Sequence, residues 1–157
     1  MIGVNYDFRE LDSVDQDLVQ QIINMEKVAF GEGGMNHWFI VPFIRHGRVF
    51  ALVDREQIVA VAEYMRDFSQ PTLAYLFGLA VKQEYQGQGL GYQLLVSAHS
   101  RLVRYGFTEV TLTADPHNQQ ALALYEQKME FQRCRFLPNE YGLGIDRLYL
   151  RLQLSGF

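Results

Sequence analysis

The chain has 157 residues, of which 48% are hydrophobic and 20% charged, a composition typical of one globular domain over residues 1–157 rather than of a disordered chain. Its formal net charge of −4 at pH 7 argues against general nucleic-acid binding through phosphate neutralisation. The single cysteine excludes an intrachain disulfide and favours a reducing compartment. No apolar run approaches the ~18 residues of a membrane span, and the N-terminus does not resemble a signal peptide, so we expect a cytoplasmic protein without a membrane span.

The first half of the chain predicts an order of strand, two helices and three strands. Ser13 and Gln16 have the spacing of a capping box, which predicts a helix over 14–30. A short second helix is expected over 36–45, although Pro42 disfavours its far end. Apolar patterns between short polar turns predict strands over 5–11, 49–53, 58–65 and 73–81.

The second half predicts a helix over 89–105, closed by Gly106, and a helix over 119–129. Strands are expected over 109–114, 131–137 and 145–154, with leucines at 148, 150, 152 and 154 sharing one face of the last. The order is not a regular strand-helix alternation. We therefore expect a mixed α/β (α+β) fold with a mostly antiparallel central sheet flanked by about four helices.

Glycines at alternate positions mark the junction between the strand over 73–81 and the helix that follows, in the stretch Gln86-Gly87-Gln88-Gly89-Leu90-Gly91. Such a turn exposes the first unpaired N–H groups of the helix, which suit a phosphate or pyrophosphate. A P-loop is excluded because Tyr92 and Gln93 follow the last glycine instead of Lys-Ser/Thr. A dinucleotide fingerprint is disfavoured because its third glycine would come one residue later. The alternative is a turn that only allows strand and helix to pack tightly.

This stretch fits the pattern Q/R-x-x-G-x-G/A and resembles the coenzyme A loop of the GNAT superfamily of N-acetyltransferases. The resemblance implies acetyl-CoA as co-substrate, no metal, and a central sheet splayed near Leu79–Val81. It implies that the backbone of the strand pairs with the pantetheine arm and that the loop amides hold the pyrophosphate. The cofactor-binding residues implied in this way are Leu79, Ala80, Val81, Gln86, Gly87, Gln88, Gly89, Leu90, Gly91 and Tyr92.

A second motif, over 118–125, is similar to the N-x-x-A-x-x-L-Y helix of the same superfamily. It implies that Asn118 and Tyr125 contact the cofactor and that the Tyr125 hydroxyl stabilises or protonates the leaving thiolate. Taken alone, the two residues are more typical of a helix cap and a half-buried core aromatic. Where relatives commonly have a glycine after this helix, the chain has Glu130, which must adopt a left-handed conformation unless the turn differs.

The general base has two candidates. Tyr75 is the one polar candidate in the strand over 73–81, and Glu63 on the preceding strand is the nearest carboxylate by topology. A solvent-facing position for Glu63 is the alternative, to which we give equal weight. Cys134 is expected to be a buried, inert thiol.

The acceptor site has only candidate walls, which are Phe30, Trp38, Phe39 and the turn over 139–141. His37 is a weak candidate for the same site. The other histidines, His46, His99 and His117, are expected at the surface.

The sequence predicts an N-acetyltransferase that moves an acetyl group from acetyl-CoA to a primary amine by direct attack in a ternary complex, with Tyr125 and Glu63 as catalytic residues. The acceptor is a small-molecule amine or an amine of a peptide or protein, and we also expect a homodimer. The alternative is a non-catalytic acyl-CoA-binding sensor or interaction module on the same fold.

Overall fold

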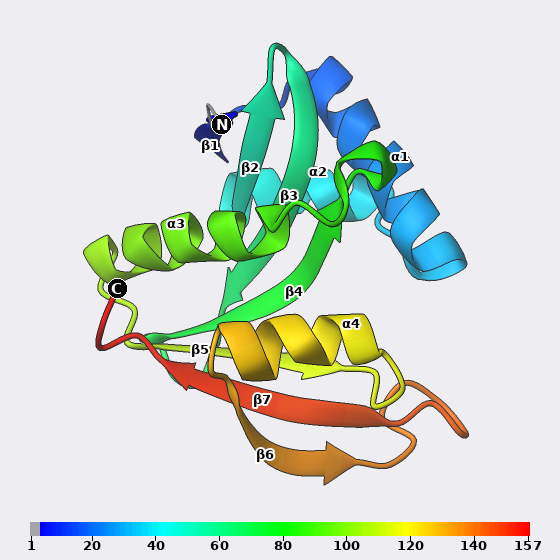
Figure 1. The fold of residues 1–157 in the computed structure, drawn as a ribbon, viewed down its shortest axis with the longest axis vertical. Helices are drawn as coiled ribbons and strands as arrows, with labels where there is room; N and C mark the ends of the chain where they lie inside the picture. Colours follow the sequence, from blue (N-terminus) through cyan, green and yellow to red (C-terminus); the bar gives the residue numbers. More distant parts are fainter. Residues whose placement is uncertain (1–3) are drawn as a thin grey trace. The chain divides into compact units, whose positions relative to one another are not determined.

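A computed structural model describes residues 4–157 and divides them into two compact units (Figure 1). The first unit contains the chain up to Met65 together with Phe77–Ala98, and the second contains Arg66–Leu76 and His99–Phe157. The chain passes from one unit to the other within strand β4 (Leu73–Val81) and helix α3 (Leu90–Arg104). Within residues 4–157 there is no helix with the length and apolarity that a membrane crossing requires.

The first unit is built on an antiparallel meander of β1 (Asp7–Leu11), β2 (Arg48–Asp54) and β3 (Gln57–Arg66). Helices α1 (Gln16–Phe30) and α2 (His37–His46), joined by the short turn Gly31–Gly33, supply the apolar side chains that cover one face of these strands. The core of this unit contains Leu11, Val19, Ile22, Met25, Met35, Ile40, Ile44, Val49, Ala51, Val53, Ile58, Val61 and Ala80.

The cap of α1 differs from the prediction. Asp15, and not Ser13, is the N-cap, because its Oδ1 accepts hydrogen bonds from the N–H groups of Asp17 and Leu18 at 2.9 and 3.2 Å. Helix α2 begins after Asn36 and continues past Pro42 to His46, so the proline lies inside the helix.

In the second unit the start of β4 pairs in parallel with β5 (Glu109–Ala114), which pairs antiparallel with β7 (Arg147–Gln153), and β7 pairs with β6 (Gln132–Leu137). The leucines at 148, 150 and 152 are buried, as their alternation predicts. Seven strands, in the hydrogen-bonded order β1-β2-β3-β4-β5-β7-β6, make a mixed, mostly antiparallel sheet. This confirms the predicted fold class, while the splay near Leu79–Val81 stays a prediction.

The predicted helix over 119–129 changes its winding partway. It begins as α4 (Gln119–Leu122) and continues as a π-helical segment over Ala123–Lys128, with the Met129 N–H bonded to the carbonyl of Leu124 at 2.9 Å. Single π-turns inside helices are frequent at functional sites. After the segment, Glu130 has a φ of 65°, which confirms the left-handed conformation expected in place of a glycine.

Two predicted environments are wrong. His99 is fully buried, with ring centroids 6.2 and 5.2 Å from those of Phe131 and Phe157, and burial lowers its pKa to about 3 so that it is neutral. Cys134 is exposed, because it lies at a register irregularity of β6, at the edge of the sheet.

Glu130 supplies a direct test of the backbone after the π-helical segment. A left-handed conformation costs an L-residue about 1–2 kcal/mol. Glycine avoids this strain, but it loses more backbone entropy on folding, which cancels part of the gain. We expect Glu130→Gly to raise the free energy of unfolding by up to about 1 kcal/mol in urea denaturation. Glu130→Ala, which keeps the strain, should show no gain, and equal effects of the two substitutions would contradict the assigned conformation.

Candidate functional site

The turn between β4 and α3 is shaped by two glycines with positive φ, Gly87 at 80° and Gly89 at 76°. A Cβ atom at either position would meet nothing within 4 Å, so the glycines serve the backbone conformation and the space beside them is open. The first hydrogen bond inside α3 runs from the Gln93 N–H to the carbonyl of Gly89 at 3.0 Å. The N–H groups of residues 90–92 therefore have no partner within the helix, and they favour an anion.

Two tyrosines of the same unit hold this turn in place. The Tyr6 hydroxyl donates to Oε1 of Gln88 at 3.2 Å, and the Tyr85 hydroxyl donates to Oδ2 of Asp54 at 3.1 Å. The two rings meet edge to face with centroids 5.9 Å apart. The hydrogen bond with Asp54 raises the pKa of Tyr85. Sequence reasoning missed both tyrosines, because no motif connects Tyr6 with Gln88 or Tyr85 with Asp54.

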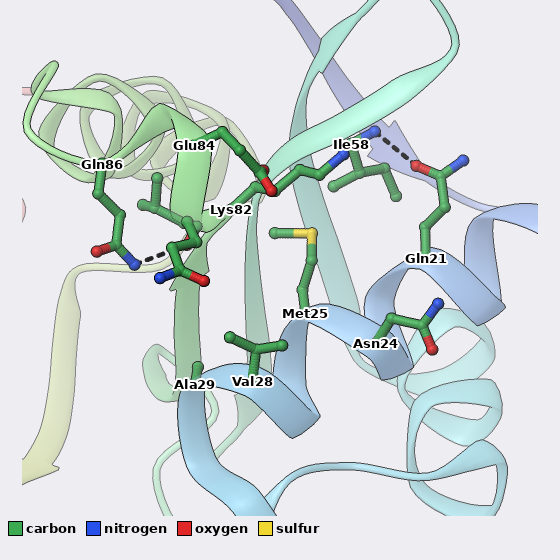
Figure 2. Close-up of a pocket in the computed structure, with 11 residues that line it drawn as sticks. Gln21, Asn24, Met25, Val28, Ala29, Ile58, Lys82, Glu84 and Gln86 are labelled. Atoms are coloured by element: carbon green, nitrogen blue, oxygen red, sulfur yellow. Dashed lines mark hydrogen bonds between the residues drawn. The ribbon is translucent and has the colours of Figure 1, made fainter.

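A pocket of about 460 Å³ lies beside the turn, between α1 and the chain that follows β4 (Figure 2). Figure 2 shows Met25 reaching from α1 toward this chain, with Val28 and Ala29 one turn further along the helix. The Gln86 side-chain amide donates to the carbonyl of Val81 at 3.2 Å. The volume suits a small organic ligand. The lining residues are Gln21, Asn24, Met25, Val28, Ala29, Ile58, Val81, Lys82, Gln83, Glu84 and Gln86.

Two buried carboxyl groups meet beside β4. Glu63 of β3 is fully buried and Glu26 of α1 is 2% exposed. Oε2 of Glu63 lies 2.8 Å, and Oε1 of Glu26 3.5 Å, from the position that a Cβ atom on Gly78 would occupy. Only glycine leaves this room, so the sequence places both acids against the backbone just before Leu79–Val81. The solvent-facing alternative for Glu63 is wrong.

The protonation of Glu63 depends on its burial and on the neighbouring Glu26. Oε1 of Glu26 and both carboxyl oxygens of Glu63 are buried without a hydrogen-bond partner among the described residues. Burial, and next the negative charge of Glu26, raise the pKa of Glu63 well above its usual value. A carboxyl group with a raised pKa has the proton affinity of a general base that works near neutral pH.

In the second unit, a chain of hydroxyl groups links Tyr75 of β4 to the turn over 139–141. Oγ1 of Thr113 lies 3.4 Å from the Tyr75 hydroxyl and 3.1 Å from the Tyr141 hydroxyl. Arg147 donates to the Thr113 hydroxyl at 3.1 Å and to its carbonyl at 2.8 Å. Thr113 and Arg147 were missed by sequence reasoning, because residue type alone gives them no function.

This network shifts the pKa values of the two phenols, Tyr75 and Tyr141, in opposite directions. Burial raises the pKa of Tyr75 to about 12. Burial acts in the same direction on Tyr141, but the hydrogen bonds with Thr113 and Tyr75, together with the charge of Arg147, lower the Tyr141 pKa. The Arg147 guanidinium stands 4.7 Å from the centroid of the Tyr141 ring. Tyr141 is therefore the more acidic of the two hydroxyls and also the more exposed.

The second motif has the local structure that its residues favour when taken alone. Oδ1 of Asn118 accepts a hydrogen bond from the Ala121 N–H at 3.0 Å and caps α4. Tyr125 lies in the π-helical segment, with its ring centroid 5.8 Å from that of Phe131. Their cofactor and catalytic roles stay predictions.

The predicted acceptor walls of the first unit are exposed. The exposed fractions are 46% for Phe30, 87% for Trp38 and 56% for Phe39, and His37 is also exposed. Trp38 and Phe39 lie in the first turn of α2, directly after its N-cap.

The sequence pattern of the Acetyltransferase (GNAT) family matches residues 19–131, which is most of the chain. The chain belongs to this family, as its two motifs predict. The matched residues include the glycine turn, both buried acids and the segment over 118–125.

Among curated proteins, the N-alpha-acetyltransferase MAK3 of Arabidopsis thaliana is 35% identical over 88 residues, which are 56% of this chain and 46% of that protein. The match thus spans about half the length of this relative.

Solved structures share the fold. A crystal structure of the NatC complex bound to Gag peptide and CoA matches 97% of this chain and 100% of its own, with a TM-score of 0.80 and 20% identity. A crystal structure of aminoglycoside 6'-acetyltransferase type Ii matches 96% of this chain and 99% of its own, with a TM-score of 0.82 and 16% identity.

The raised pKa of Glu63 predicts how the stability of the protein depends on pH. Between the usual value of about 4.3 and the raised pKa, the folded state keeps a proton that the unfolded state releases. The free energy of unfolding therefore falls as the pH rises through this window, by at most about 1.4 kcal/mol per pH unit. We expect Glu63→Gln, whose amide does not titrate, to show a flatter curve in urea denaturation at a series of pH values. An equally steep fall in the variant would contradict the assignment.

Proposed function

We propose that the protein transfers an acetyl group from acetyl-CoA to a primary amine by direct attack in a ternary complex. The glycine turn carries the proposal, because it opens α3 with free amides beside open space in a chain of the acetyltransferase family. The amides of residues 90–92 hold the pyrophosphate, together with the preceding turn from Gln86. The backbone of Leu79, Ala80 and Val81 pairs with the pantetheine arm.

The chemistry forms one bond and breaks one. The neutral amine nitrogen attacks the thioester carbon, a C–N bond forms, and the C–S bond breaks to release coenzyme A. A backbone N–H near Leu79 polarises the thioester carbonyl. Tyr125 gives a proton to the departing thiolate, a role that a phenol hydroxyl can fill. Asn118 fixes the start of the helix that leads to Tyr125.

Glu63 is the proposed general base, because its raised pKa suits the removal of a proton from the attacking ammonium. The carboxyl group lies against Gly78, one residue before the strand segment assigned to the pantetheine arm. The proton then ends on a fully buried carboxyl group beside Gly78, next to the strand segment proposed to hold the pantetheine arm.

The acceptor that we favour is an amine of a peptide or protein. The names of the N-alpha-acetyltransferase relative and of the peptide-bound NatC structure support this choice. So do the exposed aromatics Trp38 and Phe39 at the start of α2, which suit a peptide chain more than a single small amine. A small-molecule amine is the second candidate, supported by the likeness to the aminoglycoside acetyltransferase.

A coenzyme A release assay with a panel of amines tests the proposal. The panel contains peptides with free N-termini, peptides with lysine and a blocked N-terminus, polyamines and aminoglycosides. We expect release with at least one N-terminal peptide and an added acetyl group in its mass spectrum. Binding of acetyl-CoA without turnover of any amine would favour the sensor alternative instead.

A homodimer and a cytoplasmic location complete the proposal. Light scattering that shows a monomer over the working range of concentrations would remove the dimer.

Gly89→Val tests the cofactor turn. Valine is strained at a φ of 76° and fills the space beside the amides, so we expect at least a tenfold loss of coenzyme A affinity in calorimetry, or about 1.4 kcal/mol. Gly106→Val is the matched control, because Gly106 has a φ of 88° and an equally open surrounding but lies at the far end of α3. The control should lose stability and keep its affinity. Unchanged affinity in Gly89→Val would contradict the assigned site.

Tyr125→Phe tests the leaving-group acid, because it keeps the ring and removes only the hydroxyl. General acid catalysis typically supplies about 100-fold or more, so we expect kcat to fall by about this factor with little change in acetyl-CoA affinity. Tyr105→Phe, at the end of α3, is a control that should keep the parent rate. If Tyr125→Phe turns over at the parent rate, Tyr125 is not the acid, and water protonates the leaving thiolate.

A further inference from the structure

Glu26 is a carboxylic acid in the apolar face of a helix. Its neighbours Ile22 and Met25 belong to the core of the first unit, and Glu26 itself is 2% exposed. The chain holds this point of α1 tightly, because a Cβ on Gly34 would lie 2.7 Å from the Glu26 carbonyl oxygen. A carboxyl group at such a position costs free energy unless something compensates it.

No cation of the described residues provides that compensation. Glu63 faces Gly78 on β4, which has no side chain, and its ladder partner on β2 is Val49. The buried side chains that α1 and α2 contribute to this face are apolar apart from Glu26. Among the ionisable groups within residues 4–157, Glu26 is the one whose charge acts on Glu63.

Two buried acids without a cation cannot both be ionised at low cost. One proton held between them changes this balance, because the protonated carboxyl becomes a donor to the ionised one. The shared proton joins one oxygen of each carboxyl group, so two of the three buried oxygen atoms without another partner are satisfied.

We infer that Glu26 is a positioning residue for Glu63, and that the two carboxyl groups share one proton beside Gly78. The inference rests on the proposed role of Glu63 as general base. In the resting pair there is one proton and one negative charge. When the attacking ammonium loses its proton, its N–H bond breaks and an O–H bond forms on Glu63, while the shared proton stays on Glu26, which leaves both acids neutral.

Glu26→Gln tests the pair. The amide removes the neighbouring charge and donates a hydrogen bond to ionised Glu63, so both effects lower the pKa of Glu63. We expect a ¹³C-carboxyl NMR titration of the full chain to show the Glu63 midpoint lower by about one pH unit or more. The acid limb of the pH profile of kcat/KM should move in the same direction. Glu32→Gln, an exposed acid after α1, is the control that should change neither.

Glu26→Met is the second variant if the glutamine does not fold, since it keeps the volume and removes the charge. An unchanged Glu63 titration in a folded variant at position 26 would overturn the inference. The two proposals fail in different ways. If Glu63→Gln turns over at the parent rate, Glu63 is not the base, whereas the NMR midpoint still decides whether the pair exists.

Discussion

The backbone geometry of the turn at Gly87 and Gly89 is the constraint on which the proposed chemistry depends. Both residues have positive φ, and they form the turn through which the chain passes from β4 into α3. The space beside both glycines is open. Ordering glycine costs more backbone entropy than ordering any other residue, and the bonds of Tyr6 to Gln88 and of Tyr85 to Asp54 offset part of that cost. These two hydrogen bonds fix the turn from within the protein, which lowers the cost of holding a flexible cofactor.

A second constraint acts on strand β4 at Gly78. Glu26 and Glu63 bring two acids into a core that is otherwise apolar, an arrangement that lowers stability at neutral pH. Perturbed acids of this kind cluster at functional sites, where local cost is retained for chemistry. Gly78 links the two features, because its missing side chain admits the acids directly before the segment proposed to hold the thioester arm.

Local patterns were enough to predict the features that local physics determines. The bounds of β4 and β5 agree with their apolar runs, and the glycine spacing predicted a turn that opens a helix. Contacts between residues far apart in the chain could not be predicted from local sequence patterns. His99 is buried because its face of α3 meets Phe131 and Phe157, and Glu26 finds Glu63 only once α1 lies over β3. The π-helical turns around Tyr125 also have no signature in residue type.

The most direct test of the central claim is an amide NMR titration of the full chain with coenzyme A and, separately, with pantetheine, which lacks the pyrophosphate. Coenzyme A should shift the N–H signals of residues 87–92 strongly. Pantetheine should leave these signals near their free positions and affect mainly those of residues 79–81. Equal shifts of residues 87–92 with both ligands, or no shift there with coenzyme A, would contradict the account.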